Sequence, residues 1–114
     1  MKSFLIPVLL CISILSVTSC EVFGDSEYKY VVTGTSGDYS VTFQNEDDNT
    51  QQNSSVSNGW SYSWMQGGTR WLYISAQNNK STGDVTVRIY RDGEIVESNT
   101  SYGGYSIATV SGEY

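Results

Sequence analysis

The stretch VTVRIYRDGEIVES, residues 85–98, decides the fold of this 114-residue chain. Two runs of alternating apolar and polar residues flank an Asp-Gly pair, which is a strong signal for a β-hairpin with a type I′ turn. A two-residue turn at Asp92 and Gly93 sets the register of the two strands. This register pairs Arg91 with Glu94, Tyr90 with Ile95, Ile89 with Val96, and Arg88 with Glu97.

The two faces of this hairpin differ in character. Because side chains alternate along a strand, one face carries the aliphatic residues and points to the core. The other face carries Tyr90 and Ile95 opposite each other, and Arg88 opposite Glu97 as an attractive pair. Tyr90 and Ile95 are either ordinary exposed apolar residues or part of a contact patch. The residues expected in the core are Val85, Val87, Ile89 and Val96.

The rest of the chain repeats this kind of pattern. We find no helical periodicity of useful length, and runs rich in Val, Ile, Thr, Tyr and Trp alternate with clusters of turn residues. We therefore predict an all-β protein, a single immunoglobulin-like β-sandwich of about seven antiparallel strands. Paired cysteines flanking a Trp are missing, so the likeness is one of architecture. The expected strands cover residues 28–34, 39–44, 60–65, 71–77, 84–90, 94–98 and 105–111.

A second hairpin is possible around Gly67 and Gly68. If these residues form a two-residue turn, Trp64 lies opposite Trp71. A second aromatic pair then lies further from the turn on the same face, and the two pairs form an aromatic ladder. That second pair is Tyr62 with Tyr73.

A competing pattern in the second of these strands opposes the ladder. An aliphatic stripe there has the spacing of a core face, which would send Trp71 and Tyr73 outward. A longer turn or a bulge would let each strand choose its own buried face, so both orientations of Trp71 and Tyr73 stay open. We expect Trp60 and Trp64 in the core, because large aromatic residues dominate core energetics. The stripe consists of Leu72, Ile74 and Ala76.

Residues 45–59, NEDDNTQQNSSVSNG, are too polar and too long for an ordinary hairpin loop, so we predict a solvated loop. The acids and amides of residues 45–49 could supply oxygen ligands to calcium, but their spacing matches no calcium loop. Asp47 and Asp48 could also be read as a glycosidase pair, but they lie on a loop tip with no cleft in prospect. We interpret this run as a soluble turn.

The N-terminal sequence predicts where the protein is located. A cationic start precedes an apolar run over residues 4–17, which is too short for a membrane span and has the length of a signal-peptide core. The run ends in VTSC, which resembles the lipobox of bacterial lipoproteins, so Cys20 is expected to be acylated. Several acyl chains anchor a protein firmly. The alternative is a structural thiol, but the only possible partner is Cys11, inside the segment that would be removed.

This reading divides the chain into three parts. Residues 1–19 are the signal peptide, residues 20–27 are the lipidated cysteine and a short linker, and residues 28–114 are the β-sandwich. Residues 20–114 contain five basic and twelve acidic residues, which gives them a net charge of −7. We expect no nucleic-acid partner, because phosphate neutralisation supplies most of such affinity.

The residue types present after Cys20 also argue against catalysis. The chain has no histidine, and Cys20 is the only cysteine of the mature part. Transition-metal sites and Ser-His or Cys-His nucleophiles therefore lack their usual ligands or bases. We expect a protein that is not an enzyme and that has no cofactor and no metal site.

The order of motifs resembles the MmpS family, small membrane-anchored β-sandwich proteins. The resemblance implies an accessory role, because mycobacterial members assist MmpL transporters in exporting lipids and siderophores. Two features depart from the family: Gly59 replaces a typical proline, and Cys20 replaces a transmembrane helix as the anchor. The motifs are YKYVVTG (28–34), VTFQNEDDNTQQ (41–52), WSYSW (60–64), YISAQNN (73–79), GDVTVRIYRDGEIV (83–96) and YSIATVSGEY (105–114).

Two functions follow as expectations for a lipoprotein of the bacterial cell envelope, with the outer membrane favoured over the inner. The first is an accessory or adaptor domain that docks on an envelope protein, for example one related to transport. The second is a glycan- or small-ligand-binding module, because exposed aromatic side chains stack on sugar rings. The candidate contact residues for both are Trp71, Tyr73, Tyr90 and Ile95.

Overall fold

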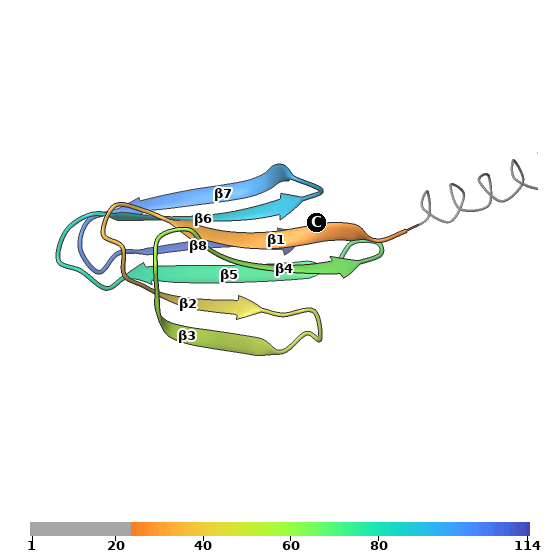
Figure 1. Ribbon diagram of the computed structural model, residues 1–114, viewed down its shortest axis with the longest axis horizontal. Helices are drawn as coiled ribbons and strands as arrows, with labels where there is room; N and C mark the ends of the chain where they lie inside the picture. The colour runs from red at the N-terminus through yellow and green to blue at the C-terminus, as the bar shows by residue number, and fades with distance from the viewer. Residues whose placement is uncertain (1–23) are drawn as a thin grey trace, which may run out of the picture.

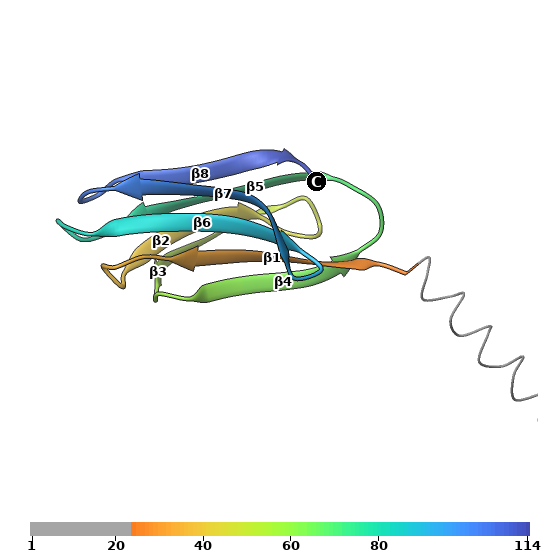
Figure 2. The same cartoon turned by 90° about the horizontal axis from the view of Figure 1, so that it is seen from above.

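The computed structural model describes residues 24–114, which form eight β-strands in two antiparallel sheets packed face to face (Figures 1 and 2). The predicted all-β sandwich is confirmed. Sheet A has the order β4 (Trp60–Gln66), β1 (Ser26–Thr33), β6 (Asp84–Arg91), β7 (Glu94–Tyr102). Sheet B has the order β3 (Thr50–Val56), β2 (Tyr39–Gln44), β5 (Trp71–Asn78), β8 (Ile107–Glu113).

The strand order limits the likeness to immunoglobulin domains. In those domains the first two strands pair within one sheet. Here β1 and β2 lie in opposite sheets, and the chain changes sheet again between β4 and β5. The architecture is shared, and the connectivity differs. Within the described residues, no helix is long and apolar enough to cross a membrane.

The core lies between the sheets and is aromatic on one side. Tyr28 and Tyr30 of β1 are fully buried, and the ring of Trp64 packs 5.7 Å and 4.9 Å from their ring centroids. Phe43 of β2 packs 5.6 Å from Tyr30 and so joins the two sheets. Trp60 lies half-buried at the margin of this group. The predicted burial of Trp64 is confirmed, and that of Trp60 is confirmed in part.

The β6–β7 hairpin confirms the predicted turn. Asp92 and Gly93 have φ values of 51° and 84°, as a type I′ turn requires. The first two predicted pairs form, Arg91 with Glu94 and Tyr90 with Ile95.

Beyond these two pairs the predicted register is wrong. The ladder shifts by one residue, so that Ile89 lies opposite Glu97 and Arg88 opposite Ser98. The cause is a β-bulge in β7, an edge strand, where an extra residue is easily accommodated. Val96 is therefore 37% exposed, and its predicted place in the core is wrong.

The predicted loop over residues 45–59 contains the strand that the sequence analysis missed. Strand β3 pairs with β2, and every residue of β3 except Val56 is exposed. Since both faces meet solvent, no apolar alternation marks the strand, and its Asn53 is of a type depleted in strands. The turn itself is short: Asn45 Oδ1 accepts hydrogen bonds from the N–H groups of Asp47 and Asn49, at 2.9 and 3.0 Å.

The proposed hairpin through Gly67 and Gly68 does not form. Strand β4 belongs to sheet A and pairs with β1, whereas β5 belongs to sheet B, so residues 67–70 cross between the sheets. Trp64 lies opposite Tyr28, and Tyr62 opposite Tyr30. The aliphatic stripe is confirmed as core: Leu72, Ile74 and Ala76 are each at most 1% exposed.

The two ends of the sandwich carry different turns. The end at which β1 begins, here called the entry end, carries turns 45–49, 67–70 and 92–93. The opposite end, here called the far end, carries turns 34–38, 57–59, 79–83 and 103–106. Three strands differ from prediction by two residues or more at an end: β1 begins at Ser26, β7 extends to Tyr102, and β8 covers Ile107–Glu113.

Candidate functional site

The predicted anchor residue, Cys20, lies outside the described residues. The described fold begins close to it in the chain, because β1 starts at Ser26.

The outer face of sheet A brings Tyr90 and Ile95 together. The two residues lie directly opposite each other on β6 and β7, and Ile95 is 53% exposed. Lys29 of β1 pairs with Tyr90 on the other side, with its Nζ 5.2 Å from the centre of the tyrosine ring. This is a cation–π contact. The patch therefore joins an aliphatic, an aromatic and a cationic side chain on an acidic protein.

The outer face of sheet B carries Trp71 and Tyr73, which settles the alternative left open by the sequence. Both residues alternate with the buried stripe of β5, and Trp71 is 54% exposed while Tyr73 is half-buried. Their cross-strand neighbours on β8 are polar, Glu113 beside Trp71 and Ser111 beside Tyr73. The four predicted contact residues thus form two separate pairs on opposite faces of the sandwich.

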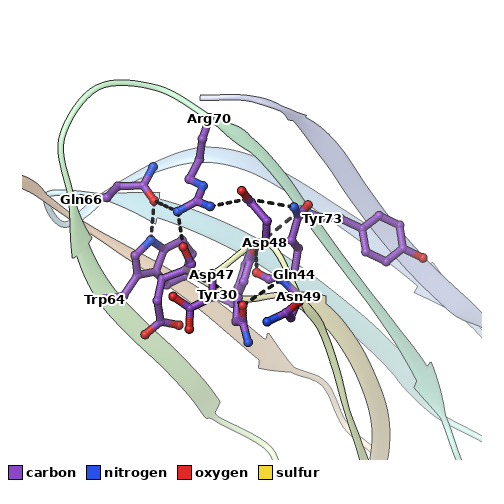
Figure 3. Close-up of polar contacts among 11 residues, drawn as sticks. Tyr30, Gln44, Asp47, Asp48, Asn49, Trp64, Gln66, Arg70 and Tyr73 are labelled. Carbon is purple, nitrogen blue, oxygen red and sulfur yellow. Dashed lines mark hydrogen bonds and ion pairs between the residues drawn. The ribbon is translucent and has the colours of Figure 1, made fainter.

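A cluster at the entry end centres on Arg70 and was missed by the sequence analysis (Figure 3). Arg70 Nη1 donates to the carbonyl oxygen of Glu46 at 2.6 Å and to Gln66 Oε1 at 3.1 Å, and Arg70 Nη2 forms an ion pair with Asp48. Gln66 Oε1 also accepts from the indole N–H of Trp64 at 2.6 Å. Tyr73 points away from this cluster (Figure 3). Arg70 therefore ties the acidic turn to the crossing segment between the sheets.

The contacts of this cluster also occupy a carboxylate of the acidic turn that could otherwise bind a cation. The carboxylate of Asp48 is engaged by Arg70, and it accepts a further bond from Gln44 at 3.1 Å. Across residues 24–114, no three His, Cys, Asp or Glu side chains gather in a way that could hold a metal ion.

Two tyrosines near this end have altered acidity. The hydrogen bond that Tyr62 donates to Glu46, with a smaller effect of burial, raises the pKa of Tyr62 to about 12. The same hydrogen bond lowers the pKa of Glu46, although burial acts on it in the opposite direction. Burial raises the pKa of Tyr30 to about 12, although a bond from the Tyr73 N–H acts in the opposite direction. Both phenols therefore remain protonated at neutral pH and act as hydrogen-bond donors; Tyr30 donates to the carbonyl of Gln44 at 2.7 Å.

The far end exposes apolar residues that the sequence analysis did not single out. Tyr102, Tyr105 and Ile107 are 78%, 60% and 55% exposed. Tyr105 has φ of 59°, in the left-handed region that aromatic residues rarely adopt. The neighbouring Gly104 packs so tightly that an added Cβ would lie 2.3 Å from the carbonyl oxygen of Ser81. The Gly-Gly-Tyr sequence of this turn was the available signal.

A buried asparagine holds these far-end turns. Asn78 is fully buried, and its Nδ2 donates to the carbonyls of Thr82 and Gly103, at 2.9 and 3.1 Å. Its Oδ1 accepts from the N–H of Lys80 at 2.9 Å. The turns after β5 and β7 are thereby tied together.

The sandwich has a shallow polar hollow along its β7–β8 flank. Across it, Asn99 Nδ2 donates to the carbonyl of Thr109 at 3.0 Å. The hydroxyl of Tyr114 donates to Glu97 at 2.9 Å. These two bonds close this flank between the sheets. The hollow is lined by Glu97, Ser98, Asn99, Thr109, Val110 and Ser111.

No family model matches the chain, and no curated protein is similar enough to it to be a relative.

Proposed function

We propose that the chain is a lipid-anchored, non-enzymatic adaptor of the bacterial cell envelope, which docks on a protein partner through the outer face of sheet A. The support for the anchor is the VTSC sequence ending at Cys20. The resemblance to MmpS proteins supports an accessory role for the sandwich, and with Cys20 as the anchor in place of a transmembrane helix it names no particular transporter as the partner. Neither argument depends on catalytic residues.

The observation that carries the docking proposal is the patch formed by Lys29, Tyr90 and Ile95. Interfaces draw most of their binding free energy from a few aromatic and aliphatic anchors in the middle of a polar surround. Tyr90 is fixed at its place by the cation–π contact with Lys29, 5.2 Å from the ring centre, so little side-chain entropy is lost on binding. The positive charge of Lys29 in this patch also suits an acidic partner surface.

The experiment is site-specific crosslinking in the native envelope. A photoreactive residue replaces Tyr90, and a control strain carries it at Ser75, on the outer face of sheet B. We expect a discrete adduct with one envelope protein from position 90 alone, and loss of the complex in Tyr90→Ala. Equal adducts from both positions, or none from position 90, would contradict docking through sheet A.

The second candidate function, glycan binding, rests on Trp71. Its indole is 54% exposed on the face of sheet B beside Ser111 and Glu113, which offers a stacking platform with polar neighbours. A soluble sugar should then quench tryptophan emission saturably. Trp71→Ala should abolish the quenching, because Trp64 is buried and the half-buried Trp60 lies on β4 of the other sheet. Quenching that persists without Trp71 would exclude this platform.

A further inference from the structure

The four edge strands differ in how they are protected against pairing with other chains. Natural edges are blunted by charges, prolines or bulges, or are covered. Strand β7 has Glu94, Glu97 and a bulge. Strand β8, the edge of sheet B beside it, is connected to β7 by a side-chain bond from Asn99 to the carbonyl of Thr109. Strand β3 has an irregular register with β2. Strand β4 has none of these features: its sequence WSYSWMQ is uncharged and free of proline, and its seven pairs with β1 run without a shift.

The direction of the β4 backbone can be read from its neighbour β1. The carbonyl of Glu27 accepts the N–H of Asp92 at 2.7 Å, so the backbone of Glu27 faces β6. By the alternation of an antiparallel ladder, Tyr28 and Tyr30 bond instead to β4, through Trp64 and Tyr62. The backbone groups of the intervening β4 residues therefore face the free edge. These residues are Ser61, Ser63 and Met65, and all three are exposed.

Beyond this edge, strand β3 of sheet B is also left uncovered. Phe43 of β2 packs 5.3 Å from Trp60 and 4.7 Å from Tyr62, which places β4 over β2. Sheet B continues one strand further, to β3, with no strand of sheet A opposite it among the described residues (Figure 1). The exposure of β3 on both faces agrees with this offset. A strand added to β4 would therefore complete sheet A and cover β3.

We propose that β4 is a strand-addition site, which takes an extended, uncharged or cationic segment of a partner protein antiparallel to β4. The free backbone groups of Ser61, Ser63 and Met65 supply the hydrogen bonds, as in other cases of β-augmentation. Inward side chains of the segment lie beside the half-buried rings of Trp60 and Tyr62. This site goes beyond the proposed function, because it binds through the free backbone groups of β4 and not through the side chains of Tyr90 and Ile95.

Charge selects the kind of segment. Glu46, in the turn of residues 45–49 at the entry end, accepts a hydrogen bond from the hydroxyl of Tyr62 of β4, and the neighbouring Asp47 is exposed. These carboxylates favour a Lys or Arg and disfavour an acidic segment. A second copy of the chain fits less well, because edge pairing about a twofold axis is antiparallel. It would point the two entry ends, and any anchors at Cys20, in opposite directions.

The test uses the full chain in detergent and a synthetic peptide, KTVTYTVT, with blocked ends. Hydrogen exchange followed by NMR should show slowed exchange at the amides of Ser61, Ser63 and Met65 when the peptide binds. The same peptide N-methylated at alternate residues keeps the side chains but loses backbone donors, and should not bind. Slowed exchange elsewhere, equal binding of the methylated peptide, or no binding at millimolar peptide would overturn the proposal.

A variant of the protein gives a second readout. Ser63→Pro removes an outward-facing donor and is tolerated at an edge whose N–H points to solvent. It should weaken peptide binding roughly tenfold, the equivalent of one to two backbone hydrogen bonds, while Ser63→Thr binds as the natural protein does. Unchanged affinity in Ser63→Pro would overturn the proposal, as would concentration-dependent self-association through β4 without peptide. Because neither assay involves Tyr90 or Trp71, failure here leaves the adaptor proposal to its own test.

Discussion

At the scale of single residues, Asn78 shows how one side chain orders a whole end of the molecule. It is fully buried, and it makes three hydrogen bonds to backbone groups of two turns. A buried polar group is stabilising only when its partners are present, and those partners are costly to leave unpaired. Tyr105 holds its left-handed backbone conformation directly beside this network, with its N–H bonded to the carbonyl of Lys80 at 3.0 Å.

Replacing Asn78 by Ala should lower the free energy of unfolding by about 3 kcal/mol, because three hydrogen bonds of about 1 kcal/mol each are lost. Urea unfolding followed by tryptophan emission measures the change. Asn53→Ala is the matched control, because Asn53 is exposed on β3 and should change stability by no more than about 0.5 kcal/mol. Equal effects of the two substitutions would contradict the network.

The tyrosine pKa values predict how stability depends on pH. Tyr30 and Tyr62 have pKa values of about 12 in the folded protein, above the ordinary 10.0. Between these values the folded state keeps protons that the unfolded state releases, so the free energy of unfolding falls as pH rises from 10 to about 12. Below pH 10 these two groups contribute no slope. Urea midpoints measured across this range check the prediction.

Tyr30→Phe is the control for that measurement. It keeps the buried ring but removes the hydroxyl, so the alkaline loss of stability should become shallower than in the natural protein. An unchanged slope in Tyr30→Phe would show that other groups titrate there.

At the scale of elements, the β6–β7 hairpin separates what local sequence can predict from what it cannot. The Asp-Gly pair determined the turn and the two nearest pairs, because its positive φ values are a local requirement. The bulge after Ile95 leaves no such mark, since alternation on an edge strand is only weakly constrained by packing. Strand β3 was not predicted for a related reason, because a strand solvated on both faces shows no alternation of apolar and polar residues.

The corrected register predicts different effects for two valines. Val87 is fully buried, so Val87→Thr places a hydroxyl in the core and should lower the free energy of unfolding by about 1–3 kcal/mol. Val96 is 37% exposed in the bulge, so Val96→Thr should change it by no more than about 0.5 kcal/mol. Thermal unfolding of both variants is the measurement. A large loss in Val96→Thr would favour the unshifted register.

At the scale of the whole molecule, connections decide what the strands alone leave open. Residues 67–70 have the glycines of a hairpin turn but cross between sheets, and only long-range contacts explain this. The hydroxyl of Tyr28 lies 3.0 Å from the carbonyl of Gly68 and 2.9 Å from that of Tyr114. Arg70 bonds the turn between β2 and β3. The orientation of Trp71 follows from this crossing. The sequence alone therefore could not determine which way this candidate site residue points.

Negative charge is concentrated at the entry end, where this crossing lies. Most carboxylates of the described residues lie at the entry end, where the nearby cations are Lys29, Arg70 and Arg91. Exposed like charges at this density repel one another and destabilise the compact state. The carboxylates at this end are Asp25, Glu27, Glu46, Asp47, Asp48, Asp92, Glu94 and Glu113.

This asymmetry predicts that salt stabilises the fold. Raising NaCl from about 0.01 M to about 0.5 M shortens the screening length from about 30 Å to a few ångströms, which weakens the repulsion among these exposed carboxylates. Screening also weakens the Arg70–Asp48 pair, but one exposed pair contributes at most about 1 kcal/mol against many repulsive terms. The free energy of unfolding should therefore rise with salt, by on the order of 0.5–1 kcal/mol. Asp47→Asn removes one exposed charge from the turn, so it should be more stable than the natural protein at low salt and gain less from added salt. Stability that falls with salt in both proteins would mean that the Arg70–Asp48 ion pair outweighs the repulsion among the carboxylates.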